Sequence, residues 1–108
     1  MFDHDALLRA IRSLMHDPLE GEPEALRKRL ECTLTDGYAH ALALEGERIQ
    51  LERELTAVAT GLGEGENDGA VARIADLSTR LRSTDTNLAE LRVLLASLRD
   101  RAGALRAA

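Results

Sequence analysis

The sequence predicts an all-α protein in which a short N-terminal helix precedes a long antiparallel coiled-coil helical hairpin. Composition is the first reason: of the 108 residues 44% are hydrophobic but only 2% aromatic, which is typical of long Leu- and Ala-rich helices. Periodicity is the second, because leucines recur at alternating spacings of three and four residues, as in a heptad seam. A glycine-rich segment between two such stretches is the third. At this length we expect one domain, residues 1–108.

Helix start and stop signals divide the chain into predicted elements. Asp3 is a good cap for a first helix, and Pro23 suits the first position of a second one. The triplet Thr35-Asp36-Gly37 is a candidate break, but we expect a continuous or kinked helix there. The predicted segments are a short helix over 3–16, a first long helix over 23–60, a loop over 61–69 and a second long helix over 70–106.

A hydrophobic seam is predicted between the two long helices. Because a short loop makes consecutive helices antiparallel neighbours, Leu55 should lie near Ile74, and Leu51 near Leu77. Arg48 and Thr84 interrupt the inner positions of the seam. They either set the register, with Arg48 extending to solvent, or form a polar layer in which a ligand or partner group pairs with Arg48. The predicted seam residues are Leu44, Leu51, Leu55, Ile74, Leu77, Leu81, Leu88, Leu91, Leu95 and Leu98.

Charge is distributed unevenly along the chain, whose net charge is −5. Residues 1–66 carry 14 acidic and 7 basic side chains, whereas residues 67–108 carry 5 acidic and 7 basic ones. We expect the arginines of the second long helix to face acids of the first, with Glu54 opposite Arg73 and Glu47 opposite Arg80 as inter-helix ion pairs that fix orientation. The basic excess of the second half is too small for a nucleic-acid-binding surface, so no nucleic-acid partner is expected.

Several other classes of protein are not expected. No apolar run approaches the roughly 20 residues of a membrane span, and the acidic N-terminus is unlike a signal peptide, so we expect no membrane association and a cytoplasmic location. Cys32 is the single cysteine and is expected to be half-buried. His4, His16 and His40 are far apart in the sequence and are expected at the surface. We predict no metal site, no cofactor and no catalytic residue, and therefore a protein that is not an enzyme.

Residues 85–100, DTNLAELRVLLASLRD, resemble the signature helix of RsiG-type anti-sigma factors of actinobacteria. That family is built from antiparallel helical hairpins and holds cyclic di-GMP with an E-x3-S-x2-R-x3-Q-x3-D pattern. Arg92 and Asp100 match the pattern and Asp85 replaces its glutamate, whereas Ala89 and Ala96 stand in place of the serine and the glutamine. The resemblance implies Asp85, Arg92 and Asp100 as contacts of cyclic di-GMP, with two side-chain hydrogen-bonding groups missing.

The sequence predicts a helical-hairpin protein–protein interaction module, a regulator or adaptor that self-associates, most simply as a homodimer. The apolar stripe is wider than a two-helix seam covers, because Tyr38, Leu42, Ile49, Val93 and Leu94 lie beside the seam. No residue encodes the identity of a protein partner. Two alternatives stay open: an anti-sigma factor of the RsiG type, with or without bound cyclic di-GMP, and a purely structural coiled-coil dimer.

Overall fold

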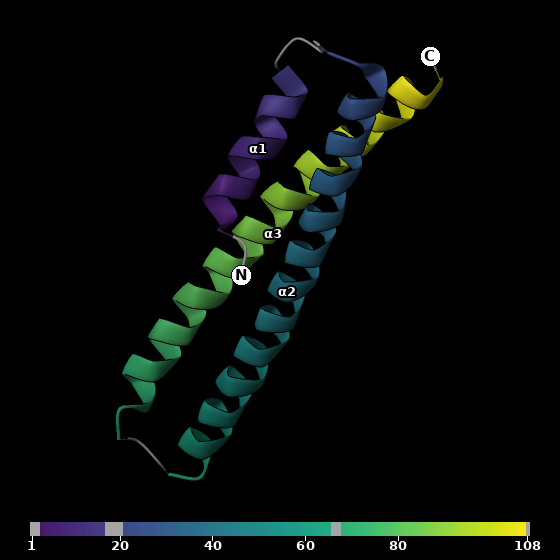
Figure 1. Ribbon diagram of the computed structural model, residues 1–108. Coiled ribbons are helices and arrows are strands. Elements are labelled where there is room, and N and C mark those ends of the chain that lie inside the picture. Colours follow the sequence, from purple (N-terminus) through teal and green to yellow (C-terminus); the bar gives the residue numbers. More distant parts are fainter. Residues whose placement is uncertain (1–2, 17–20, 66–67, 108) are drawn as a thin grey trace. The chain divides into compact units, whose positions relative to one another are not determined.

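The computed structural model describes residues 3–16, 21–65 and 68–107, and these residues form three α-helices (Figure 1). They are α1 (His4–His16), α2 (Pro23–Gly63) and α3 (Ala70–Ala107). The two long helices pack against each other as an antiparallel hairpin, so the predicted all-α class and hairpin are confirmed. Internal contacts divide the chain into two units. The first unit combines Met1–Leu42 with Ala89–Ala108, and the second is Ala43–Leu88.

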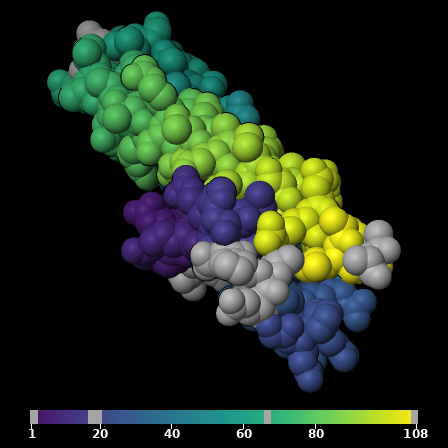
Figure 2. Space-filling view, turned by 90° about the horizontal axis from the view of Figure 1, so that it is seen from above, coloured from purple at the N-terminus to yellow at the C-terminus, as the bar shows by residue number. Residues whose placement is uncertain are grey.

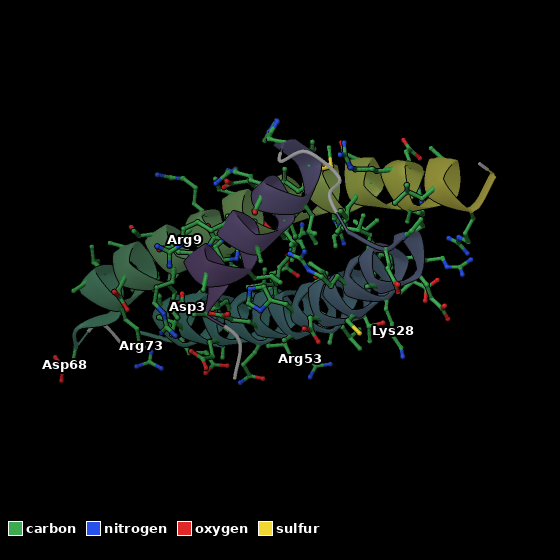
Figure 3. All side chains as sticks on the ribbon, turned by 45° about the horizontal axis from the view of Figure 1, so that its top comes forward. Asp3, Arg9, Lys28, Arg53, Asp68 and Arg73 are labelled. Carbon is green, nitrogen blue, oxygen red and sulfur yellow. The ribbon has the colours of Figure 1, made fainter. Side chains whose placement is uncertain are left out.

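Side-chain and backbone groups satisfy the start of α1 as the sequence suggests. The Asp3 carboxylate accepts a hydrogen bond of 3.1 Å from the backbone N–H of Asp5, and the Asp3 carbonyl accepts one of 3.0 Å from the backbone N–H of Leu7; Figure 3 labels Asp3. Both bonds occupy groups that a helix end otherwise leaves unpaired. Pro23 begins α2, where its missing N–H costs no helical hydrogen bond.

The end of α2 differs from the predicted boundary. The helix continues past Thr60 to Gly63, and the backbone N–H of Glu64 still donates to the Thr60 carbonyl at 3.1 Å. The backbone leaves the helical region at Gly65, whose φ of 94° is readily adopted only by glycine, and Gly69 has a φ of 70° just before α3. The first long helix is therefore longer than predicted, and among the described residues of the connection the left-handed backbone conformation occurs at Gly65 and Gly69.

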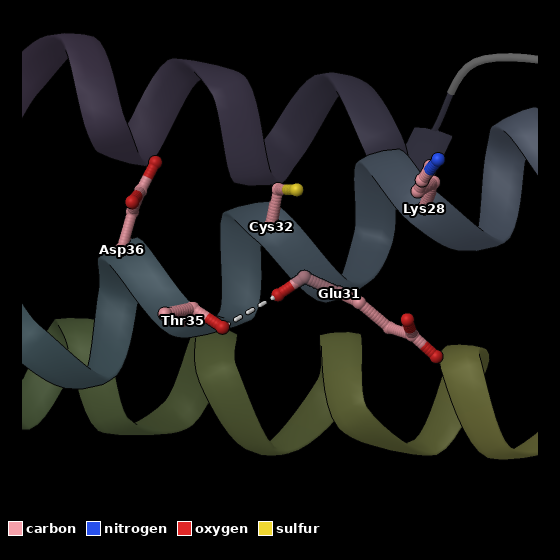
Figure 4. A pocket seen from close by; sticks show the side chains of 5 residues that line it. All are labelled: Lys28, Glu31, Cys32, Thr35 and Asp36. Atoms are coloured by element: carbon pink, nitrogen blue, oxygen red, sulfur yellow. Dashed lines mark hydrogen bonds between the residues drawn. The ribbon is translucent and has the colours of Figure 1, made fainter.

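No helix break occurs at the predicted candidate. Helix α2 runs through Thr35, whose hydroxyl donates to the backbone carbonyl of Glu31 at 3.0 Å instead of capping a new helix (Figure 4). Gly37 is buried, and a Cβ added there would overlap Cδ2 of Leu95 on α3. The glycine thus serves a close approach between the two long helices within the first unit, which offsets its poor helix propensity.

Three helices build the core of the first unit. The apolar face of α1 is buried. Figure 2 shows α1 (purple) beside the C-terminal part of α3 (yellow). Burial of each large aliphatic side chain contributes about 1.5–3 kcal/mol to stability. The buried apolar residues of this unit are Leu7, Leu8, Ile11, Leu14, Leu26, Leu30, Leu34, Ala41, Leu91, Leu95, Leu98 and Ala102.

Two helices build the core of the second unit. Leu44, Leu51, Leu77 and Leu88 are buried there, as the predicted seam requires. Further seam residues remain partly open to solvent, since a pair of helices covers only one side of each side chain. These half-buried seam residues are Leu55, Ile74 and Leu81.

Candidate functional site

Of the two predicted inter-helix ion pairs, the structure contains Glu54–Arg73 and, among the residues that it describes, lacks Glu47–Arg80. Nη2 of Arg73 lies 3.9 Å from Oε2 of Glu54 in the second unit (Figure 3 labels Arg73). Glu47 and Arg80 are both exposed, and within the described part of the chain neither belongs to an ion pair. The predicted Glu47–Arg80 pair is therefore wrong. A pair as long and exposed as Glu54–Arg73 contributes little stability and mainly favours one orientation.

Arg48, the residue after Glu47, forms an ion pair with α3 instead. Its Nε lies 2.9 Å from Oδ1 of Asp85 on α3 and 3.2 Å from Oε1 of Glu52 on its own helix. The Arg48 side chain is 45% exposed, so its charged end extends to solvent, as one of the two predicted arrangements requires, whereas Thr84 is buried. The long aliphatic stem of arginine explains the difference, because it lets the charged end leave the seam and reach a carboxylate at its edge.

The positions implied by the RsiG resemblance all lie on α3. In the second unit, the Asp85 carboxylate is engaged by Arg48. In the first unit, Arg92 and Asp100 are exposed. A ligand that used Asp85 would compete with an existing ion pair, and cyclic di-GMP binding stays a prediction.

Large apolar side chains are exposed in each unit. On α2 in the first unit, Tyr38 is 47% exposed and Leu42, one turn later, is 69% exposed; we call these two residues the α2 patch. On α3 of the same unit, Val93 is 67% exposed. In the second unit, Ile49 and Val71 are exposed. Leu94, predicted to widen the stripe, is half-buried.

Two polar contacts join α1 to α3 within the first unit, and neither was predicted from the sequence. Nη2 of Arg12 lies 2.6 Å from Oε1 of Glu90 on α3. Nη1 of Arg101 donates to the backbone carbonyl of Met15 at 2.9 Å, so an arginine of α3 serves the C-terminal turn of α1. Neither pairing could be read from periodicity, because each joins residues far apart in the sequence.

A third contact of α1 joins two histidines. Nδ1 of His4 lies 3.0 Å from Nε2 of His40 on α2. His40 is only 9% exposed, so its predicted surface location is wrong, whereas His16 is exposed as expected. A signal for His4 exists in the sequence: it precedes Leu7, Leu8 and Ile11 at helical spacing and so belongs to the apolar face of α1.

A shallow pocket on α2 of the first unit surrounds the single cysteine (Figure 4). Its lining residues are Lys28, Glu31, Cys32, Thr35 and Asp36. The thiol of Cys32 is exposed, not half-buried as predicted, because α2 turns this face to solvent. Among the residues that the structure describes, no group of three or more His, Cys, Asp or Glu side chains could hold a metal ion, and no helix is long and apolar enough to cross a membrane.

Comparison with known proteins gives no assignment: no protein-family model, no curated protein and no solved structure matches the chain. The α2 patch is the candidate site, because it places two large apolar side chains in water on a helix whose opposite face is buried.

Proposed function

We propose that the chain is a helical-hairpin protein–protein interaction module that self-associates, and that the α2 patch contacts a second copy. The observation that carries the proposal is the exposure of Leu42 and Tyr38, 69% and 47%, one turn apart. The same stretch of α2 buries Leu34 and Ala41 on its inner side. The helix is thus apolar on two sides in the first unit, and the hairpin itself covers only one of them.

Charge favours a second copy as the occupant of the patch. With a net charge of −5, two chains repel each other over most of their surface. Thr35 and Ala39, which are exposed and lie on the same side of α2 as the patch residues, are uncharged and small, whereas the exposed Asp36 points to a different side of the helix. An uncharged face is compatible with itself, which a symmetric dimer requires, and small side chains allow two helices to approach closely. Two copies can meet here without bringing like charges together.

Sedimentation equilibrium at tens of micromolar tests the proposal, with a dimer expected for the unchanged protein. Leu42→Glu should weaken the dimer at least tenfold, about 1.4 kcal/mol, because it removes apolar contact and places like charges across the interface. Val71→Glu is the matched control: Val71 is 72% exposed but lies in the second unit, so this change should leave the dimer intact.

Two results would contradict the proposal. One is a monomer at tens of micromolar for the unchanged protein. The other is an equal loss of dimer in the Leu42→Glu and Val71→Glu variants, which would indicate a general effect of added charge. Circular dichroism of each variant checks that the helices remain, as expected for changes at exposed positions.

A further inference from the structure

The histidine pair of the first unit has the geometry of a direct imidazole–imidazole hydrogen bond. The two nitrogens are 3.0 Å apart, the ring centroids are 5.2 Å apart and the ring planes are tilted by 41°. The distance between the ring centroids exceeds the distance between the two nitrogens by roughly one centroid-to-nitrogen distance from each ring. The two nitrogens therefore point toward each other. One ring therefore donates its N–H to the lone pair of the other. The bond joins the first residue of α1 to a nearly buried position of α2.

This hydrogen bond limits how many protons the pair can hold. An N–H···N bond needs one nitrogen without a proton, and two imidazolium rings offer none. In addition, Nε2 of His4 is buried and has no hydrogen-bond partner among the described residues. A charged His4 would hold an N–H donor there without an acceptor, which costs free energy. The docked pair therefore takes up at most one extra proton, whereas two imidazoles in water take up two.

The charged side chains nearest the pair along each helix are carboxylates and one arginine. Because Leu95 packs on Gly37 and the long helices are antiparallel, the nearest charged residues of α3 are those about one turn before Leu95. Imidazole is the side chain whose unperturbed pKa lies between pH 5.5 and 7.5, so the histidines are the groups tested over this interval. The charged residues within four positions of either histidine are Asp3, Asp5 and Asp36, and those of α3 at the level inferred from the Gly37–Leu95 contact are Glu90 and Arg92.

We propose that the His4–His40 pair is a pH-sensitive clasp that holds the start of α1 on α2 and opens on acidification. The sign follows from linkage: the released state binds one more proton than the docked state, so acid favours release as the pH falls through about 6.5. Release uncovers the apolar face of α1, including Leu7, Leu8 and Ile11. The clasp would thus couple the proton concentration to exposure of apolar surface, independently of the proposed self-association.

Amide hydrogen exchange of the full chain at pH 7.5 and 5.5, corrected for the intrinsic exchange rate, tests the clasp. Protection of the amides of residues 8–14 in α1 should fall about tenfold, since one additional proton at an ordinary histidine pKa changes the opening equilibrium by that factor. Amides of residues 77–88, in the second unit, serve as the internal reference and should keep their protection.

Matched variants identify the groups responsible. His40→Gln retains a side-chain amide that can hydrogen-bond but cannot titrate, so α1 protection should change less than twofold between the two pH values. His4→Gln makes the same test from the other partner, should the first variant not fold. His16→Gln removes the exposed histidine of α1 and should keep the tenfold loss. The clasp is refuted if the unchanged protein shows no loss, if the loss persists in both partner variants, or if the reference amides lose protection equally.

Discussion

The two units of the chain use the same pair of long helices but bury their seams to different extents. In the first unit α1 adds a third helix, and Ile11, Leu91 and Leu98 have no exposed surface. In the second unit two helices pack alone, and Leu55 and Ile74 stay half-buried although they occupy seam positions. A third helix closes the side that a two-helix seam leaves open to water, so heptad position alone does not set burial.

The same difference affects the polar contacts. In the first unit, polar groups hold a packed helix in place: Arg12 with Glu90, and Arg101 with the Met15 carbonyl. In the second unit, the polar contacts of Arg48 and Arg73 lie along the open edges of the hairpin. We infer that burial of apolar side chains dominates the stability of the first unit. In the second unit the total stabilising free energy is smaller, and ion pairs at the hairpin edges contribute a larger fraction of it.

The largest expected effect is a difference between shortening a seam leucine in the three-helix first unit and shortening one in the two-helix second unit. Leu98→Ala in the first unit should lower the free energy of unfolding by about 3–4 kcal/mol, because it removes a fully buried side chain and leaves a cavity. Leu55→Ala in the second unit should cost only about 1–2 kcal/mol, because its side chain is already partly hydrated. Urea denaturation monitored by circular dichroism measures both. Equal costs would contradict the inferred role of the third helix.

Glycine substitutions sharpen the comparison at the level of the backbone. Gly46→Ala on α2 should stabilise the protein by about 0.5–1 kcal/mol, since nothing lies near the added methyl group and alanine favours the helix. Gly37→Ala should instead be less stable than Gly46→Ala by about 1–3 kcal/mol, because Leu95 must move away from the new Cβ. Thermal unfolding compares them. Gly103→Ala, in the first unit with open space, is the control, and an equal gain for Gly37→Ala and Gly103→Ala would show that Leu95 yields freely.

The smallest expected effect concerns the charges at the hairpin edge. A double-mutant cycle with Arg48→Met and Asp85→Asn should give a coupling of about 0.3–1 kcal/mol, limited by solvent screening because both side chains are nearly half exposed. The same cycle with Glu47→Gln and Arg80→Gln should give a coupling near zero. High salt should reduce the first value. A larger coupling for Glu47–Arg80 than for Arg48–Asp85 would contradict the contacts in the structure.

The periodic features of this protein could be predicted from its sequence. Alternating spacings of three and four specify two helices with one apolar stripe each, and the glycines between them specify the turn, so the hairpin and the seam residues Leu51, Leu77, Leu91 and Leu98 follow. The level at which Glu54 meets Arg73 also follows from counting residues away from the turn. These features depend on spacing along a regular helix, which is a local property.

Only the tertiary structure decided which side chains meet across helices and how deeply they are buried. Arg48 occupies an inner heptad position but reaches Asp85 at the edge, Gly37 accommodates Leu95, and His40 is buried against His4. Heptad spacing assigns a direction to each side chain; it does not account for the length of an arginine stem or for a third helix that docks from another part of the chain. The docking of α1 depends on contacts between segments dozens of residues apart, and no local pattern encodes such contacts.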